Sequence, residues 1–200
     1  MTNLSVIAQV DPLYLFVFFG LFTPGPNVIL LTASGARYGF RRTVPHLMGV
    51  VIGVGITSGL TALGIGALLL KWPVLEWGLK LVSAAWMMWM AFGLWTSRPD
   101  GGGARDRPFT VIEAALFQWV NPKVWAVALA ASSAYASDLP PQLEALRLAS
   151  AFSGLNLFVC LFWSGMGALL AFLLTTPFAW KVFSRAMALA LGMFSFLVLI

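Results

Sequence analysis

The stretch Thr23-Pro24-Gly25-Pro26-Asn27 interrupts an otherwise apolar segment, residues 13–36, that is long enough to cross a bilayer. Its two prolines remove two backbone donors, and each ring would clash with a carbonyl one turn earlier, at Gly20 and Phe22. In hydrocarbon an unpaired backbone group costs several kcal/mol, so such a break persists only where protein, water or a ligand satisfies it. The break is therefore a candidate binding site.

The composition is that of an integral membrane protein. Of the 200 residues, 60% are hydrophobic and 10% are charged, which leaves room for about six membrane helices of roughly 20 apolar residues each. Residues 1–9 carry no basic residue ahead of the first apolar run, which argues against a cleaved signal peptide. The single cysteine, Cys160, cannot form an internal disulfide. The net charge of +5 comes from loops beside apolar segments, so nucleic-acid binding is not implied.

Six apolar segments can be delimited along the chain. The first begins at Asp11-Pro12, a helix N-cap followed by proline at the first helical position. The second contains two G-x-x-x-G spacings, which allow close helix packing and favour a central place in the bundle. The polar segment 97–109, with three consecutive glycines, resembles a flexible linker and divides the chain nearly in half. The six predicted spans cover about residues 11–36, 43–70, 75–96, 110–136, 144–175 and 179–200.

The fourth segment is interrupted in the same way as the first. It contains Gln118-Trp119-Val120-Asn121-Pro122-Lys123, in which the proline frees the carbonyl of Gln118. Asn121 suits the N-cap of a helix that restarts at Pro122. We therefore expect a second broken helix.

The two halves of the chain resemble each other. Residues 64–69 match residues 165–170 at an offset of 101, and the broken segments align at an offset of 94 through Asn27 and Asn121. Internal repeats are typical of transporters, and three spans per half require the second half to insert upside down. The expected fold is an all-α integral membrane domain, residues 1–200, with six transmembrane helices in two inverted repeats. The repeats cover about residues 10–96 and 110–200, helices 1 and 4 are broken, and a cytoplasmic linker, 97–109, joins the halves.

Loop charges predict the orientation. Eight basic residues fall in the loops after the first, third and fifth spans, whereas three fall on the opposite side. The positive-inside rule places the first group in the cytoplasm and both termini outside it. At about 1.5 Å per helical residue, both breaks then lie near the midplane of the bilayer. The eight are Arg37, Arg41, Arg42, Arg98, Arg105, Arg107, Lys181 and Arg185, and the three are Lys71, Lys80 and Arg147.

In combination, these motifs resemble those of one family. Pro24-Gly25-Pro26-Asn27, the basic segment over residues 39–49 and the sequence FQWVNPKVW over residues 117–125 are similar to the LysE/RhtB family of bacterial amino-acid exporters. The resemblance covers nearly the whole chain. It implies efflux of amino acids or their analogues across the bacterial inner membrane, driven by proton exchange in a six-helix inverted-repeat fold. An enzymatic activity, a cofactor or a bound metal is not expected.

The broken helices suggest how an amino acid would bind. Each half-helix that starts after a break has unpaired amides that favour a carboxylate, and each half-helix that ends before one has freed carbonyls that favour an ammonium group. The ammonium group would lie against the carbonyls near Gly20, Phe22 and Gln118. Because no acidic residue stands at the predicted midplane, neutral substrates are favoured. The predicted substrate-binding residues are Pro24, Gly25, Pro26, Asn27, Gln118, Asn121, Pro122, Lys123 and Asn156.

Some of these residues also have structural interpretations. Asn121 caps the restarted helix whether or not it contacts a substrate. Lys123 opposes the dipole in the first turn of a helix and is costly at this depth, so it needs a partner. A substrate carboxylate, a coupled acid and an interface reached by snorkelling are the alternatives. Asn156 can face either the cavity or a neighbouring helix.

The sequence does not single out one residue that would carry the proton. The candidates are His46, Glu113 and Asp11. For His46, at the cytoplasmic start of the second span, a structural role at the interface is favoured. Asp11 and Glu113 both occupy capping positions, Glu113 in an S/T-x-x-E capping box. Coupling to another ion, or through Lys123, is a further alternative.

The sequence argues against three other functions. A metal-ion exporter of a related family would have a histidine-rich or acidic loop, whereas this chain has one histidine. A thiol–disulfide electron carrier needs a cysteine near each proline break, which Cys160 alone cannot supply. A membrane scaffold would gain nothing from broken, polar helices at the midplane. The expected partners are therefore an amino-acid substrate and the lipid bilayer, and the glycine-rich second helix is compatible with a homodimer.

Overall fold

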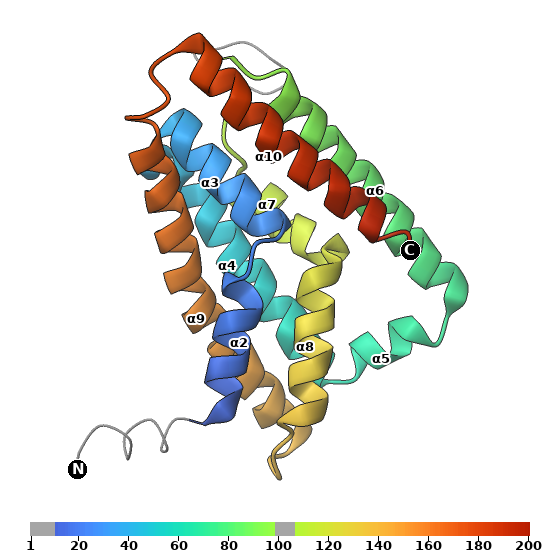
Figure 1. Cartoon of the computed structure of the whole chain (residues 1–200). Coiled ribbons are helices and arrows are strands. Elements are labelled where there is room, and N and C mark those ends of the chain that lie inside the picture. The colour runs from blue at the N-terminus through green and yellow to red at the C-terminus, as the bar shows by residue number, and fades with distance from the viewer. Residues whose placement is uncertain (1–10, 99–106) are drawn as a thin grey trace, which may run out of the picture.

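The computed structural model describes residues 11–98 and 107–200, which are helical with short connections and contain no strand. The remaining residues, which include most of the predicted linker and all of the N-terminal segment before Asp11, lie outside the described part. Figure 1 shows an elongated bundle. Its helices are α2 (Pro12–Phe22), α3 (Pro26–Tyr38), α4 (Phe40–Ala62), α5 (Ile65–Leu70), α6 (Pro73–Trp95), α7 (Val111–Val120), α8 (Pro122–Ala134), α9 (Pro141–Leu170) and α10 (Pro177–Leu197).

Both predicted breaks are present. α2 ends at Phe22 and α3 restarts at Pro26, and the two helices are bent by 59° relative to each other. α7 ends at Val120 and α8 restarts at Pro122. In each restarted helix the proline occupies the first helical position. A backbone N–H at that position has no acceptor within the helix, so proline, which lacks the N–H, costs no hydrogen bond there.

The prediction of one continuous helix over residues 43–70 is wrong. α4 starts earlier, at Phe40, and ends at Ala62, and α5 follows as a separate short helix. Gly64 has a φ of 87°, a left-handed conformation that glycine adopts without a steric penalty and that ends the helix. The two matched segments therefore differ in structure, because residues 64–69 follow this turn whereas residues 165–170 lie inside the continuous α9.

Several helices can cross a membrane. By length and composition α4, α9 and α10 qualify, and the bent pair α2 and α3 would make a fourth span. α6 and the pair α7 and α8 coincide with the predicted third and fourth spans but are not among the helices that qualify in the described part. The protein is thus a helical multi-pass membrane protein, and the number of six spans stays a prediction.

α4 lies at the centre of the bundle, as the G-x-x-x-G spacings predicted. It packs against α3, α7, α8 and α9. Gly49 and Gly53 face α7, and a Cβ on Gly53 would lie 2.6 Å from Cγ of Gln118. Gly55 and Gly59 face α9, where a Cβ on Gly59 would lie 3.3 Å from a backbone oxygen. The two glycine pairs therefore allow α4 to approach two different helices closely.

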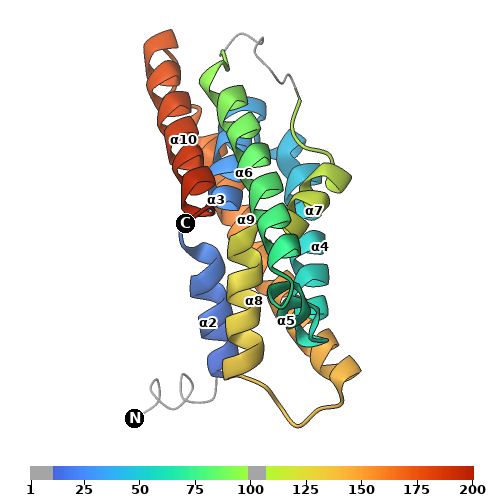
Figure 2. The same cartoon turned by 90° about the vertical axis from the view of Figure 1, so that its right-hand side faces the viewer.

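α6 and α10 pack against each other at the side of the bundle. They run side by side in Figure 1 and Figure 2, and each packs mainly on the other. Ser195 Oγ of α10 donates a hydrogen bond to the carbonyl of Ala84 in α6 at 2.8 Å. The C-terminal end of α6 and the N-terminal end of α10 lie at the upper end of the bundle in Figure 1.

The basic loops gather at that same end. α3 and α6 end there, and α4 and α10 begin there, as Figure 1 shows. Of the eight residues predicted to be cytoplasmic, Arg105 lies outside the described part. Six belong to these helix ends, namely Arg37, Arg41, Arg42, Arg98, Lys181 and Arg185.

α3 crosses α9 at a pair of glycines. A Cβ on Gly35 would overlap the carbonyl oxygen of Ser164, and a Cβ on Gly167 would overlap that of Thr32. Because α3 is the helix that restarts after the first break, this crossing holds the break against α9.

Replacing Gly167 with alanine should destabilise the protein, because the added methyl group has no room at the α3–α9 crossing. We expect the melting temperature in detergent to fall by about 2–10 °C, which corresponds to about 1–3 kcal/mol of overpacking. Gly165→Ala is a matched control in the same helix, since a Cβ at Gly165 would meet nothing within 4 Å. Equal melting temperatures for the two variants would contradict the close crossing.

Candidate functional site

The two helix breaks meet through a pair of amide side chains. Asn27 Nδ2 donates to Gln118 Oε1 at 2.8 Å, and Gln118 Nε2 donates back to Asn27 Oδ1 at 3.1 Å. Gln118 is fully buried, and its Nε2 also donates to the carbonyl of Ala114 at 2.9 Å. Residues 91 positions apart therefore satisfy each other inside the bundle.

Asn121 caps the restarted helix, as predicted. Its Oδ1 accepts a hydrogen bond from the backbone N–H of Lys123 at 3.2 Å. Its Nδ2 donates to Gln118 Oε1 at 3.3 Å, so the cap also joins the amide pair. Asn27, Gln118 and Asn121 thus form one connected group of side-chain amides.

Lys123 reaches from the second break to the first. Its Nζ donates to the backbone carbonyl of Thr23 in a short hydrogen bond and to Thr23 Oγ1 at 2.9 Å. α2 ends just before Thr23, where unpaired carbonyls and the helix dipole favour a cation. Gly25 leaves room for this contact, because a Cβ there would lie 2.8 Å from Lys123 Cδ.

This partner of Lys123 is none of the three alternatives that the sequence suggested. Thr23 belongs to the first break but is not one of the predicted binding residues. The freed carbonyls ahead of the break were the signal that could have identified it. Two of the three carbonyls predicted for a substrate ammonium already accept hydrogen bonds, Gly20 from Thr23 Oγ1 at 3.0 Å and Gln118 from the backbone N–H of Asn121 at 3.3 Å.

A small cavity lies among these residues. Its volume is about 20 Å³, which is room for about one water molecule. Its polar lining residues are Asn27, Asn121, Lys123 and Asn156. The other lining residues are Leu21, Gly25, Val28, Leu31, Val124, Val159 and Cys160.

Asn156 brings α9 into the site. Only 3% of the residue is exposed, and its Nδ2 has no hydrogen-bond partner in the part of the chain that the structure describes. A buried donor without an acceptor costs about 1–3 kcal/mol. Of the two orientations considered for Asn156, the structure has the one toward the cavity.

Of the nine predicted binding residues, five line this cavity and Gln118 is bonded to two of them. The three prolines shape the breaks: Pro26 and Pro122 open the restarted helices, and Pro24 lies in the connection between α2 and α3. Binding of a substrate by these residues stays a prediction.

None of the three candidate coupling residues lines the cavity. Glu113 forms the predicted capping box with Thr110, and it binds Arg107 through two hydrogen bonds of 2.7 and 2.9 Å. These contacts raise the pKa of Arg107 above its ordinary value. His46 is buried, and its ring centroid lies 5.0 Å from that of Phe109.

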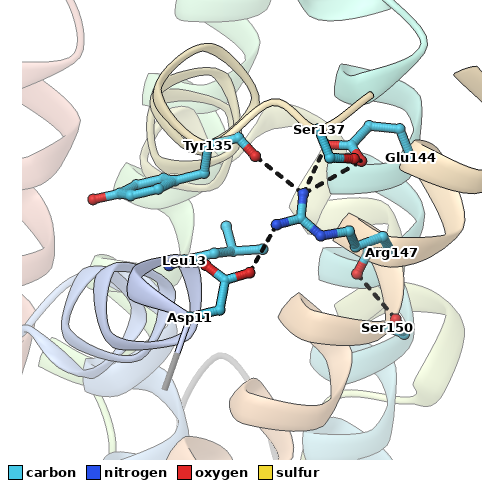
Figure 3. A network of polar contacts seen from close by, with 7 residues as sticks. All are labelled: Asp11, Leu13, Tyr135, Ser137, Glu144, Arg147 and Ser150. Atoms are coloured by element: carbon cyan, nitrogen blue, oxygen red, sulfur yellow. Dashed lines mark hydrogen bonds and ion pairs between the residues drawn. The ribbon is translucent and has the colours of Figure 1, made fainter. Parts of the chain in front are cut away.

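Asp11 belongs to a polar cluster at the other end of the bundle, drawn in Figure 3. Arg147 Nη2 donates to Asp11 Oδ2 at 2.9 Å, and Nη1 donates to the carbonyl of Tyr135 and to Glu144 Oε1, both at 3.0 Å. Asp11 Oδ1 also accepts from the backbone N–H of Leu13 at 2.9 Å, which confirms the predicted cap. The cluster therefore joins the start of α2, the end of α8 and the start of α9.

The partners of Asp11 keep its side chain charged. The hydrogen bond from Leu13, and then the one from Arg147, lower the pKa of Asp11 below its ordinary value. At neutral pH the carboxylate is therefore ionised, and a structural role is favoured over proton transfer. Proton transfer through Asp11, Glu113 or His46 stays a prediction.

Asp11→Asn should reduce the free energy of unfolding at neutral pH by less than about 1 kcal/mol, since it keeps the cap and removes a partly exposed ion pair. Because the folded-state pKa is lowered, this stabilisation is present above the unfolded pKa of about 3.9 and is lost as the pH falls through the folded value. The difference in melting temperature between the variant and the wild type should therefore shrink below about pH 4. A difference in melting temperature that grew on acidification would contradict the lowered pKa of Asp11.

Comparisons with known proteins agree on one family. The model of the LysE type translocator family matches residues 18–200. A cysteine/O-acetylserine efflux protein of Salmonella typhimurium is 30% identical over 125 residues, which cover 62% of this chain and 63% of that protein. The protein of the same name from Escherichia coli O1:K1 is 32% identical over 125 residues, or 62% of each chain. The match thus spans less than two thirds of these relatives, and no solved structure matches the chain significantly.

Proposed function

This chain belongs to the LysE type translocator family, and we propose that it is a secondary transporter that exports amino acids or their analogues from the cytoplasm. Transport would proceed by alternating access around the cavity between the two breaks, in exchange for protons. The chain would cross the membrane six times as two inverted repeats, each opening with a broken helix. The basic end would face the cytoplasm of a bacterial cell and both termini would lie outside it.

The observation that carries this proposal is the contact of the two breaks. Asn27 and Gln118 donate to each other, and Asn121 donates to Gln118. These amides lie beside a cavity that Asn156, whose Nδ2 has no partner in the described residues, also lines. Amides can exchange such mutual bonds for bonds to a carboxylate at small net cost. Hydrogen bonds to a charged group are worth about 1.5–3 kcal/mol, more than the neutral ones they would replace.

Lys123 and Thr23 would supply the rest of the site. In the structure the Lys123 ammonium donates a hydrogen bond to the carbonyl of Thr23, at the end of α2. A substrate ammonium group would take that carbonyl instead, and the released Lys123 would pair with the substrate carboxylate. Lys123 is thereby an internal substitute for the ammonium group of the substrate.

The cavity is too small for an amino acid in this conformation. It holds about one water molecule, so binding an amino acid requires the two breaks to separate. The Asn27–Gln118 pair joins them and must open as they do. The Asn27–Gln118 contact would form when the site is empty and break when a substrate binds. It would thereby give the transporter two states, as alternating access requires.

The substrates would be small neutral amino acids. The two relatives are efflux proteins for cysteine and O-acetylserine by name, and we extend this substrate class to the present chain. The wall is otherwise mostly apolar, with Leu21, Val28 and Val159 among its residues, and no carboxylate lines the cavity in the described residues. A basic side chain would therefore find no partner there.

Asn27→Ala and Asn121→Ala should each lower efflux of labelled cysteine or O-acetylserine at least tenfold, because each removes an amide that would bind the substrate carboxylate. Proteoliposomes loaded with the amino acid provide the measurement. Gln142→Ala serves as the control, since it removes an exposed amide remote from the cavity. Unchanged efflux and unchanged binding in both asparagine variants would refute the site.

An imposed pH gradient should drive transport if protons are exchanged for the amino acid. With liposomes loaded at neutral pH, a more acidic external buffer should accelerate efflux several-fold over a symmetric buffer, and a protonophore should abolish the difference. Efflux that ignores the gradient would rule out proton antiport while leaving export itself intact.

A further inference from the structure

A large cavity lies between the C-terminal end of α6 and the N-terminal end of α10, away from the helix breaks. Its volume is about 510 Å³. It lies at the basic end of the bundle, where Figure 1 shows these two helix ends side by side. Exposed side chains at its rim, including Trp95, Arg98 and Lys181, make it accessible from outside the protein.

Three cations line this cavity, Arg98, Lys181 and Arg185. Lys181 and Arg185 are four positions apart on α10 and so lie on one face, where like charges repel each other. No carboxylate pairs with any of the three within residues 11–98 and 107–200. Pro177, the first residue of α10, also lines the cavity, so the positive end of that helix faces the same space.

The walls also contain donors that have no acceptor. Ser97 Oγ, Trp180 Nε1 and Arg185 Nε are buried, and none has a hydrogen-bond partner among the described residues. Ser97 is 8% exposed and Trp180 is 5% exposed. Each unsatisfied donor costs about 1–3 kcal/mol. Together with the charges of Arg98 and Lys181, these three donors provide a site for a group with several acceptor oxygens and a negative charge.

From this arrangement we infer that the cavity binds the phosphate headgroup of an anionic phospholipid. Basic pockets between membrane helices on the cytoplasmic side are suited to such headgroups. The Arg185 guanidinium lies 4.6 Å from the centroid of the Trp95 ring, a cation–π pair at the level where tryptophan anchors a helix in the interface.

The surroundings favour a lipid over a soluble phosphate ion. Below the cavity, α6 and α10 expose large apolar side chains, including Phe92 at 60% and Leu189 at 64%. Acyl chains can lie along these faces while the headgroup occupies the cavity. The lipid would then bridge α6 and α10, which pack mainly on each other.

Titration of the detergent-purified protein with phosphatidylglycerol, followed by native mass spectrometry, tests the site. The wild type should bind phosphatidylglycerol more tightly than phosphatidylcholine. Arg98→Gln/Lys181→Gln should weaken phosphatidylglycerol binding about 30-fold, because two cations near the headgroup are removed. Trp180→Phe keeps an aromatic side chain but removes the indole N–H and part of the ring volume, and it should weaken binding several-fold.

Arg41→Gln/Arg42→Gln is the matched control, because it removes two exposed cations at the same end of the bundle but outside the cavity. It should leave the affinity within about twofold of the wild type. An equal loss in this control would show attraction to the basic surface as a whole and overturn the proposal. Equal binding of phosphatidylcholine, or binding of inorganic phosphate as tight as that of the lipid, would overturn it as well.

Discussion

A backbone group that loses its helical partner inside an apolar bundle has to find another, because leaving it unpaired costs several kcal/mol. Both proline breaks create such groups, and each break supplies what the other lacks. Lys123 of the second break covers the carbonyl of Thr23 at the first, and Asn27 of the first meets Gln118 beside the second. The two breaks are therefore one polar unit, and the helices attached to them cannot be positioned independently.

Glycines determine whether that unit can form. A Cβ on Gly53 of α4 would lie 2.6 Å from Cγ of Gln118, so the absence of a side chain there lets α7 bring Gln118 against the first break. Gly25 does the same for Lys123, whose Cδ would lie 2.8 Å from an added Cβ. Close helix packing and the polar site consequently depend on the same small residues, and a substitution made for packing reasons would also move the amides.

The sequence predicted the features that local chemistry determines. Prolines inside apolar segments identified both breaks, and Asn121 and the Thr110–Glu113 pair identified two caps. Local chemistry did not identify the break at Gly64, because an isolated glycine in a helical pattern is compatible with either a continuous helix or a turn. It also could not pair Asn27 with Gln118 or Lys123 with Thr23, since these contacts join residues about 90 to 100 positions apart and depend on how helices cross. The α6–α10 cavity was missed for the same reason.

The inequality of the two breaks bears on which ligands the site would accept. Only the second break carries a cation, Lys123, and its ammonium group already donates to the carbonyl of Thr23 at the first break. An amino acid holds an ammonium group and a carboxylate on one carbon, so it can replace both members of the Lys123–Thr23 contact together. A simple amine would take Thr23 but leave Lys123 without a partner, and a simple carboxylate would leave the Thr23 carbonyl bare. Either loss costs about 1–3 kcal/mol, and more where the unpaired group is charged. The Lys123–Thr23 contact would thus select zwitterions and would not discriminate between substrate side chains.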